Sequence, residues 1–223
     1  MTLRVLITGF GSFPGAPFNP TAQLVRRLAQ LRRPAFADID RTSHIFKVTY
    51  GDVDRDLPRL LAERRPDVLL MFGLAARTPH VRIETRARNS ITTIWPDAEG
   101  TQIGLGRIAA GRAEALTFGP HTARLLRASL QTGVASKSSR DAGRYLCNYL
   151  CWRAIEANAV SPKPPLTAFI HVPLVPRGTV SQRRSATPRV SFEQLVDAGE
   201  AILLEMMKAA RGSRHLPANA SAD

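Results

Sequence analysis

The sequence predicts an α/β fold: a single domain built as an α/β/α sandwich around a mostly parallel, twisted central sheet. The run from Val68 to Phe72 is continuously apolar and stops at Gly73. This pattern is typical of a strand buried on both faces, as in parallel sheets. Strand-like segments also alternate with helix-like segments along the chain. We find no linker or internal repeat among the 223 residues, so we expect one domain over residues 1–210 and a flexible tail over 211–223.

Apolar runs and turn residues mark the expected strands and loops. We predict strands at residues 4–8, 45–50, 68–72 and 166–172, and a strand or extended segment at 81–91. Residues 95–115 carry turn signals and little periodicity, so we expect a loop there.

Capping residues mark the ends of the expected helices. Asn19 caps the first helix, with Pro20 at its first position, and Pro34 stops it. Ser191 and Gln194 form a capping box at the start of the last helix. Further helices are predicted at residues 53–65, from 120 to just before Gly133, and at 144–157.

The composition and the two cysteines indicate a cytoplasmic protein. No stretch approaches the roughly 20 apolar residues that span a bilayer, and the first apolar run is too short for a signal peptide. Cys147 and Cys151 are four residues apart on one predicted helix, where a disulfide is geometrically poor and two close thiols favour a reducing compartment. Since no histidine stands at ligand spacing, we expect no metal and no cofactor.

The net charge of +13, with a pI near 11.2, admits two interpretations. One is a nucleic-acid partner. The other is a solvated, arginine-rich surface. The arginines occur as scattered doublets, and only 6% of residues are aromatic, so stacking platforms for bases are scarce. We favour the solvated surface and expect no nucleic-acid partner.

Cys147 is the first candidate for chemistry. It follows a small-residue turn, DAG at residues 141–143, and lies in the first turns of a predicted helix. The positive end of the helix dipole favours the thiolate, so a nucleophile is plausible there. The alternative is a small buried hydrophobe. That alternative fits Cys151 better, because Cys151 lies a full turn further into the helix.

His171 and Glu84 are candidates for the base and for the acid that orients it. His171 lies at the carboxyl end of a predicted buried strand, where active sites of open α/β sheets collect. Glu84 has the chemistry of the third group of a triad. A core histidine bonded to backbone groups, and a glutamate paired with its neighbouring arginines, remain the alternatives. Spacing alone does not bring the three residues together.

The glycine-rich loop at residues 9–15 follows a strand and precedes a helix, as a dinucleotide-binding loop does. Pro14 occupies the third glycine position, however, and no acid ends a clear second strand. Nucleotide binding is therefore the weaker interpretation.

Several segments, kept in order along the chain, resemble motifs of the pyroglutamyl peptidase I (pyrrolidone-carboxylate peptidase) family, cysteine peptidase family C15. The similarity covers roughly residues 3–208. Residues 141–148, DAGRYLCN, resemble its cysteine motif, and residues 169–173, FIHVP, resemble its histidine motif. The opening TGFGSF with Asn19-Pro20, the Ile83-Glu84 pair with Asn89, and residues 96–100 are similar to further family segments.

The resemblance implies that this chain removes an N-terminal 5-oxoproline from peptides through an acyl-thioester. It implies Cys147 as nucleophile, His171 as base and acid, and Glu84 as the group that orients the histidine. Family members are often dimers or tetramers, which implies a homo-oligomer. A substrate pocket is implied in which aromatic side chains enclose the flat lactam, a leucine lines the wall and an asparagine holds the loops: Phe10, Phe13 and Tyr145, then Leu146, then Asn19.

Two positions depart from the family pattern. Many bacterial members carry Gln where this chain has Leu74, and Arg where it has Ile94. The arginine is a candidate oxyanion donor, and loss of such a donor costs about 10²-fold or more. Arg77, Arg86 and Arg88 are candidates to replace it. These departures motivate a second hypothesis, a drifted family member that binds or hydrolyses another small lactam or amide.

Overall fold

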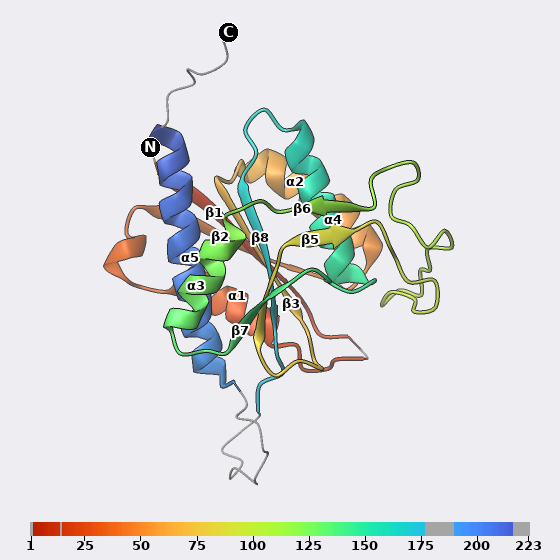
Figure 1. Ribbon diagram of the computed structural model, residues 1–223, viewed down its shortest axis with the longest axis horizontal. Helices are drawn as coiled ribbons and strands as arrows, with labels where there is room; N and C mark the ends of the chain where they lie inside the picture. The colour runs from red at the N-terminus through yellow and green to blue at the C-terminus, as the bar shows by residue number, and fades with distance from the viewer. Residues whose placement is uncertain (1, 14, 177–189, 216–223) are drawn as a thin grey trace.

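The computed structural model describes residues 2–13, 15–176 and 190–215 and confirms the predicted α/β sandwich. Its central sheet has six strands in the order β2-β1-β3-β8-β4-β7 (Figure 1). Neighbouring strands are parallel except β4 and β8, which are antiparallel. The bounds are β1 Leu3–Phe10, β2 Ile39–Phe46, β3 Val68–Leu74, β4 Val81–Glu84, β7 Ser136–Ser139 and β8 Leu166–Val172. A separate antiparallel pair consists of β5 Arg86–Arg88 and β6 Ala115–Thr117.

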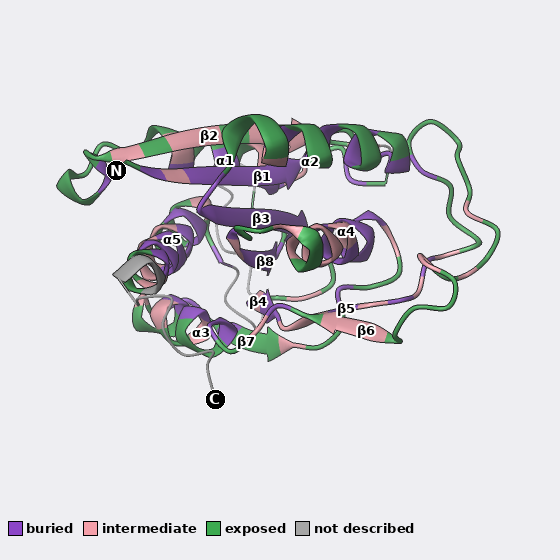
Figure 2. Cartoon of the chain, turned by 90° about the horizontal axis from the view of Figure 1, so that it is seen from above, coloured by how far each residue is buried: buried purple, intermediate pink, exposed green. Residues whose placement is uncertain are grey.

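Helices cover both faces of the sheet. One layer contains α1 Pro20–Gln30, α3 Thr122–Gln131 and α5 Phe192–His215, and the other contains α2 Tyr50–Arg64 and α4 Leu146–Val160. Figure 2 shows α3 and α5 on one side of the column of strands and α4 on the other. A short 3-10 helix, Pro34–Phe36, links α1 to β2.

The strands contribute side chains to two hydrophobic cores, one on each face of the sheet, because successive side chains point to opposite faces. In β3, Leu70 and Phe72 pack in the core beneath α1, α3 and α5, whereas Leu69 and Met71 pack in the core beneath α2 and α4. All four side chains are buried. This two-sided burial is what the continuous apolar run predicts.

The predicted caps are confirmed. The side chain of Asn19 accepts a hydrogen bond from the N–H of Thr21 at 3.1 Å, with Pro20 beginning α1. Ser191 and Gln194 exchange reciprocal side-chain to backbone bonds of 2.8 and 3.2 Å at the start of α5. Gly133 follows α3 with a φ of 79°, as a residue that ends a helix does.

The prediction of a strand at residues 45–50 is wrong. The strand β2 begins at Ile39 and ends at Phe46, and residue 50 already belongs to α2. The side chain of Thr49 accepts the N–H of Asp52 at 3.1 Å and so begins that helix. The short strand β7, Ser136–Ser139, was also not predicted.

The ends of the chain and the loop between β5 and β6 complete the fold. Helix α5 continues to His215, so the segment 211–215 of the expected tail is helical, and residues 216–223 lie outside the described part. The loop from residue 89 to 114 projects from the body (Figures 1 and 2) and exposes Ile94, Trp95 and Leu105. Within the described ranges, no helix combines the length and apolar character that crossing a membrane requires.

Candidate active site

A fixed turn delivers Cys147 to the start of α4. Gly143 has a φ of 86°, a left-handed conformation that glycine adopts without strain. Its N–H donates to the carboxylate of Asp141 at 2.9 Å, which closes the turn. Helix α4 begins at Leu146, so Cys147 is its second residue and is half-buried. The N-cap residue Tyr145 makes no side-chain cap hydrogen bond.

Gly73 provides the space for the sulfur of Cys147. A Cβ atom at residue 73 would lie 2.7 Å from Cys147 Sγ and 2.6 Å from Cζ of Phe169. Real Cβ atoms essentially never come that close to another heavy atom. The end of β3 therefore needs a residue without a side chain so that the thiol can approach the sheet.

His171 is the penultimate residue of β8. It pairs with Gly73 of β3 on one side and with Arg82 of β4 on the other. The histidine is 4% exposed, and its Nδ1 lies 2.8 Å from Oε1 of Glu84. The sulfur of Cys147 lies close enough to the ring to raise the pKa of His171. Because Nδ1 faces Glu84, the other ring nitrogen, Nε2, is free to act toward the cavity that His171 lines.

The charges around His171 favour its protonated form. Burial by itself would lower the pKa of His171, but the sulfur of Cys147 and the carboxylate of Glu84 raise it from 6.5 to about 9. Both partners act through hydrogen bonds and through their negative charge. At neutral pH the site therefore favours a protonated His171 beside the sulfur of Cys147 and the carboxyl group of Glu84.

Glu84 is fully buried at the end of β4. It contacts the histidine, as a triad acid does, and it also pairs with a neighbouring arginine. Its Oε1 contacts His171 and also lies 3.1 Å from Nη2 of Arg82. Its other oxygen, Oε2, has no hydrogen-bond partner among the described residues. A carboxylate held by two basic groups can orient the imidazole and stabilise its charge.

A cavity of about 520 Å³ opens beside Cys147 and His171. The structure brings every residue expected at the substrate pocket to its wall. Phe10 and Leu146 are buried there, and Phe13 and Tyr145 are partly exposed. Asn19 donates to the carbonyl of Gly11 at 3.0 Å and so ties the 9–15 loop to α1. The wall is therefore mainly apolar, with polar groups near the thiol.

The two departures from the family pattern lie in different places. Leu74 lines the cavity, whereas Ile94 is 72% exposed and is not part of its wall. Of the three candidate arginines, Arg77 lines the cavity. Arg86 instead donates to the carbonyl of Arg140 at 2.9 Å, and Arg88 pairs with Asp141 at 2.7 Å.

Cys151 has the environment of an inert thiol. It is fully buried in the core beneath α2 and α4. Burial and the negative charges of Glu84 and Cys147 raise its pKa well above the usual value. A thiol kept protonated in this way is a poor nucleophile.

The sequence alone indicates no role for three residues of the site. Gly73 and Arg82 act through neighbours that are distant in sequence, so no local pattern reveals them. Asn148 follows Cys147 directly, and its side chain exchanges hydrogen bonds of 2.8 and 2.9 Å with the backbone of Arg88. Its position inside the DAGRYLCN motif is the one signal that could have identified it.

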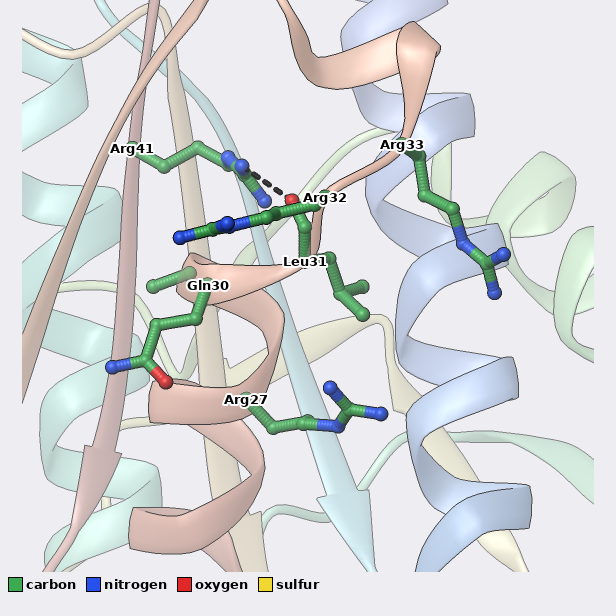
Figure 3. A pocket seen from close by; sticks show the side chains of 7 residues that line it. Arg27, Gln30, Leu31, Arg32, Arg33 and Arg41 are labelled. Carbon is green, nitrogen blue, oxygen red and sulfur yellow. Dashed lines mark hydrogen bonds between the residues drawn. The ribbon is translucent and has the colours of Figure 1, made fainter.

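A larger cavity, of about 790 Å³, lies toward the other end of the strands (Figure 3). Arg41 lines this cavity and pairs with Val5 of β1. Through Val68 of β3, this position is in register with Leu166, the first residue of β8. Arg41 donates to the carbonyls of Leu28 and Leu31 at the end of α1. The lining holds no nucleophile, histidine or carboxylate: Arg27, Ala29, Gln30, Leu31, Arg32, Arg33 and Arg41. The candidate nucleophile Cys147 and the candidate base His171 line the smaller cavity instead.

An α/β sandwich with a thiol at a helix N-terminus, beside a histidine that is hydrogen-bonded to a buried glutamate, is the arrangement of a cysteine hydrolase. The model of the pyroglutamyl peptidase family (Peptidase_C15) matches residues 3–208. The chain belongs to this family, and the predicted resemblance is confirmed.

Individual relatives agree with the family match. The pyrrolidone-carboxylate peptidase of Thermococcus onnurineus is 30% identical over 93% of this chain and 100% of its own length. That of Pyrococcus furiosus is 28% identical over 88% of this chain and 94% of its own length. The solved structure of pyrrolidone carboxyl peptidase from Thermococcus litoralis matches with a TM-score of 0.84 at 25% identity, covering 96% of this chain and 97% of that one.

Proposed function

We propose that this chain is a cysteine peptidase that hydrolyses the bond after an N-terminal pyroglutamyl (5-oxoprolyl) residue. The observation that carries the proposal is the pair Cys147 and His171 on the wall of a mainly apolar cavity, with the buried Glu84 2.8 Å behind the histidine. A neutral, flat lactam suits such a pocket with a few polar groups. Family membership favours the same substrate class.

The proposed reaction proceeds in two steps. The Cys147 thiolate attacks the carbonyl carbon of the pyroglutamyl residue, and the protonated His171 gives its proton to the leaving amine. This step breaks the peptide bond and leaves a pyroglutamyl thioester on the sulfur. In the second step His171 takes a proton from water, the resulting hydroxide attacks the thioester, and pyroglutamate and the thiolate–imidazolium pair are released.

The first turn of α4 is the candidate oxyanion site. The first N–H groups of a helix have no acceptor within the helix, and Tyr145 supplies no side-chain cap. These donors lie beside the sulfur that attacks, so they are placed to stabilise the oxyanion that forms during attack. The helix supplies this stabilisation through its backbone, which does not depend on the residue at position 94.

The pocket residues have separate proposed roles. Phe10, Phe13 and Tyr145 enclose the lactam ring, and Leu146 closes the wall. The hydroxyl of Tyr145 donates to the carbonyl of Pro96 at 2.9 Å, which fixes its ring. Asn19 holds the loop that carries Phe13.

We also propose that the enzyme acts in the cytoplasm, needs no nucleic acid and assembles as a homo-oligomer. Two free thiols, Cys147 and Cys151, suit a reducing compartment. The exposed side chains of Ile94, Trp95 and Leu105 on the projecting loop favour self-association as a dimer or tetramer.

Turnover of a fluorogenic pyroglutamyl amide, compared with the matching prolyl amide, tests the proposed function. The assay is run in reducing buffer with a chelator. We expect release of the fluorophore from the pyroglutamyl amide alone, because proline carries a charged amine where the lactam is neutral. Folded protein that hydrolyses neither amide would instead favour the drifted family member that uses the pocket for another small amide.

Glu84→Gln is expected to lower kcat/KM by about 10²-fold or more, because the neutral amide no longer stabilises the imidazolium. The substitution also removes one of the two negative charges that raise the pKa of His171.

In the wild type, kcat/KM should fall as the pH rises through about 9, where His171 loses its proton. In Glu84→Gln this alkaline limb should move to lower pH. A limb that stays in place would show that Glu84 does not set the charge of His171.

A further inference from the structure

Arg77 stands on a turn that is fixed against the catalytic strand. The N–H and hydroxyl of Thr78 both donate to the carbonyl of Ala75 at 3.0 Å. The N–H of Ala75 donates to the carbonyl of Val172 at 2.9 Å, one residue beyond His171. Arg77 therefore extends from a defined position on the wall of the cavity that contains Cys147.

Among the described residues that line this cavity, Arg77 carries the guanidinium without a compensating partner. The other lining arginine, Arg82, contacts Glu84 at 3.1 Å, the hydroxyl of Ser139 at 2.6 Å and the carbonyl of Asp141. Asp141 is the one carboxylate in the described part of the lining, and it pairs with Arg88 at 2.7 Å. Within the described part of the chain, Arg77 has no side-chain hydrogen bond or ion pair.

The acyl half of the proposed substrate offers no partner for this charge. A pyroglutamyl residue is a neutral lactam without an amine or a carboxylate of its own when it is in peptide linkage. A negative charge near the scissile bond must therefore come from the leaving group. The two sources are the terminal carboxylate of a pyroglutamyl dipeptide and an acidic side chain at the second residue.

We propose that Arg77 binds a carboxylate of the leaving group and so gives the enzyme a preference for pyroglutamyl dipeptides and for substrates with an acidic second residue. The inference rests on the proposed function and adds the substrate class. Guanidinium and carboxylate match in charge and in planar, two-pronged geometry. Because Arg77 is exposed, the preference should weaken as salt is added.

The test compares Arg77→Gln with wild type on pyroglutamyl-alanine, its C-terminal amide, and the α-amide of pyroglutamyl-glutamic acid, which keeps the side-chain carboxylate alone. The first and third substrates separate the two sources of the carboxylate. We expect kcat/KM to fall about tenfold for at least one carboxylate substrate, and to stay unchanged for the neutral amide. An equal loss on the neutral amide, or no loss on any substrate, would overturn the proposal.

Arg32→Gln is the matched control. It removes the same charge, but Arg32 lines the larger cavity, of about 790 Å³, toward the other end of the strands and has no described side-chain partner (Figure 3). We expect it to behave as wild type on all three substrates. A loss equal to that of Arg77→Gln would mean that long-range charge, and not a contact, sets the preference, and the proposal would fail.

Calorimetric binding keeps this inference separate from the reaction itself. In a Cys147→Ala background, the dissociation constant of pyroglutamyl-alanine should rise about tenfold with Arg77→Gln, and that of its amide should not. Binding with this pattern but without wild-type turnover would contradict the peptidase proposal alone. Turnover of the neutral amide by wild type without any carboxylate effect would contradict the Arg77 proposal alone.

Discussion

Cys147→Ala is expected to reduce hydrolysis of a pyroglutamyl amide by on the order of 10⁴-fold or more, because it removes the group that forms the covalent intermediate. The fold should persist, since Cys147 is half-buried at the surface of the cavity and makes no structural disulfide. The measurements are kcat/KM and the thermal midpoint of the purified protein. Full activity in this variant would refute the assignment of the nucleophile.

Cys151→Ala is the matched control for this substitution. The same chemical change is made one helical turn away, at a thiol that is fully buried and whose pKa is raised by burial. We expect activity within about twofold of wild type and a loss of about 1 kcal/mol in the free energy of unfolding from the small cavity. If Cys151→Ala were inactive and Cys147→Ala active, the roles of the two thiols would be reversed.

Gly73→Ala is expected to lower kcat/KM by about 10²-fold, although residue 73 has no functional group. Its new methyl group would lie 2.7 Å from Cys147 Sγ and 2.6 Å from Phe169 Cζ. Phe169 is fully buried and packs against the ring of His171, with the ring centroids 5.0 Å apart. Both partners must shift, and a displacement of about 1 Å at reacting atoms costs about 10²-fold. Overpacking should also cost about 1–3 kcal/mol of stability.

Gly51→Ala separates this local effect from the general effect of adding a methyl group. Gly51 lies in the first turn of α2, and nothing stands within 4 Å of its added Cβ. Alanine is the better helix former, so stability should rise by up to about 1 kcal/mol with activity unchanged. The steric account of Gly73 would be contradicted by a Gly73→Ala variant that keeps wild-type kcat/KM.

The strands that the sequence located least well are the two edges of the sheet, β2 and β7. Interior strands such as β3 and β8 are covered on both faces and therefore appear as apolar runs. Edge strands keep polar and charged residues, which discourage pairing with other chains. The sequences IDRTSHIF in β2 and SKSS in β7 show this, so neither has the pattern of a buried strand.

The candidate site could be predicted where a motif stands on one element, and not where it depends on tertiary contact. The DAGRYLCN and FIHVP segments each place one functional side chain at the end of an element, so Cys147 and His171 were identifiable. The space at Gly73 exists because β3 and α4 meet, and the unpaired charge of Arg77 is defined by the partners that its neighbours already have. Such relations appear once the chain is folded.

Trapping the acyl-enzyme tests the central claim most directly. Wild-type protein is mixed with an excess of a pyroglutamyl amide, quenched in acid within the first turnovers, digested and analysed by mass spectrometry. We predict a pyroglutamyl group on the peptide that contains Cys147, lost on incubation at neutral pH and absent with the prolyl amide. An adduct on Cys151, or turnover of the amide by an enzyme that never carries the acyl group on sulfur, would contradict the proposed mechanism.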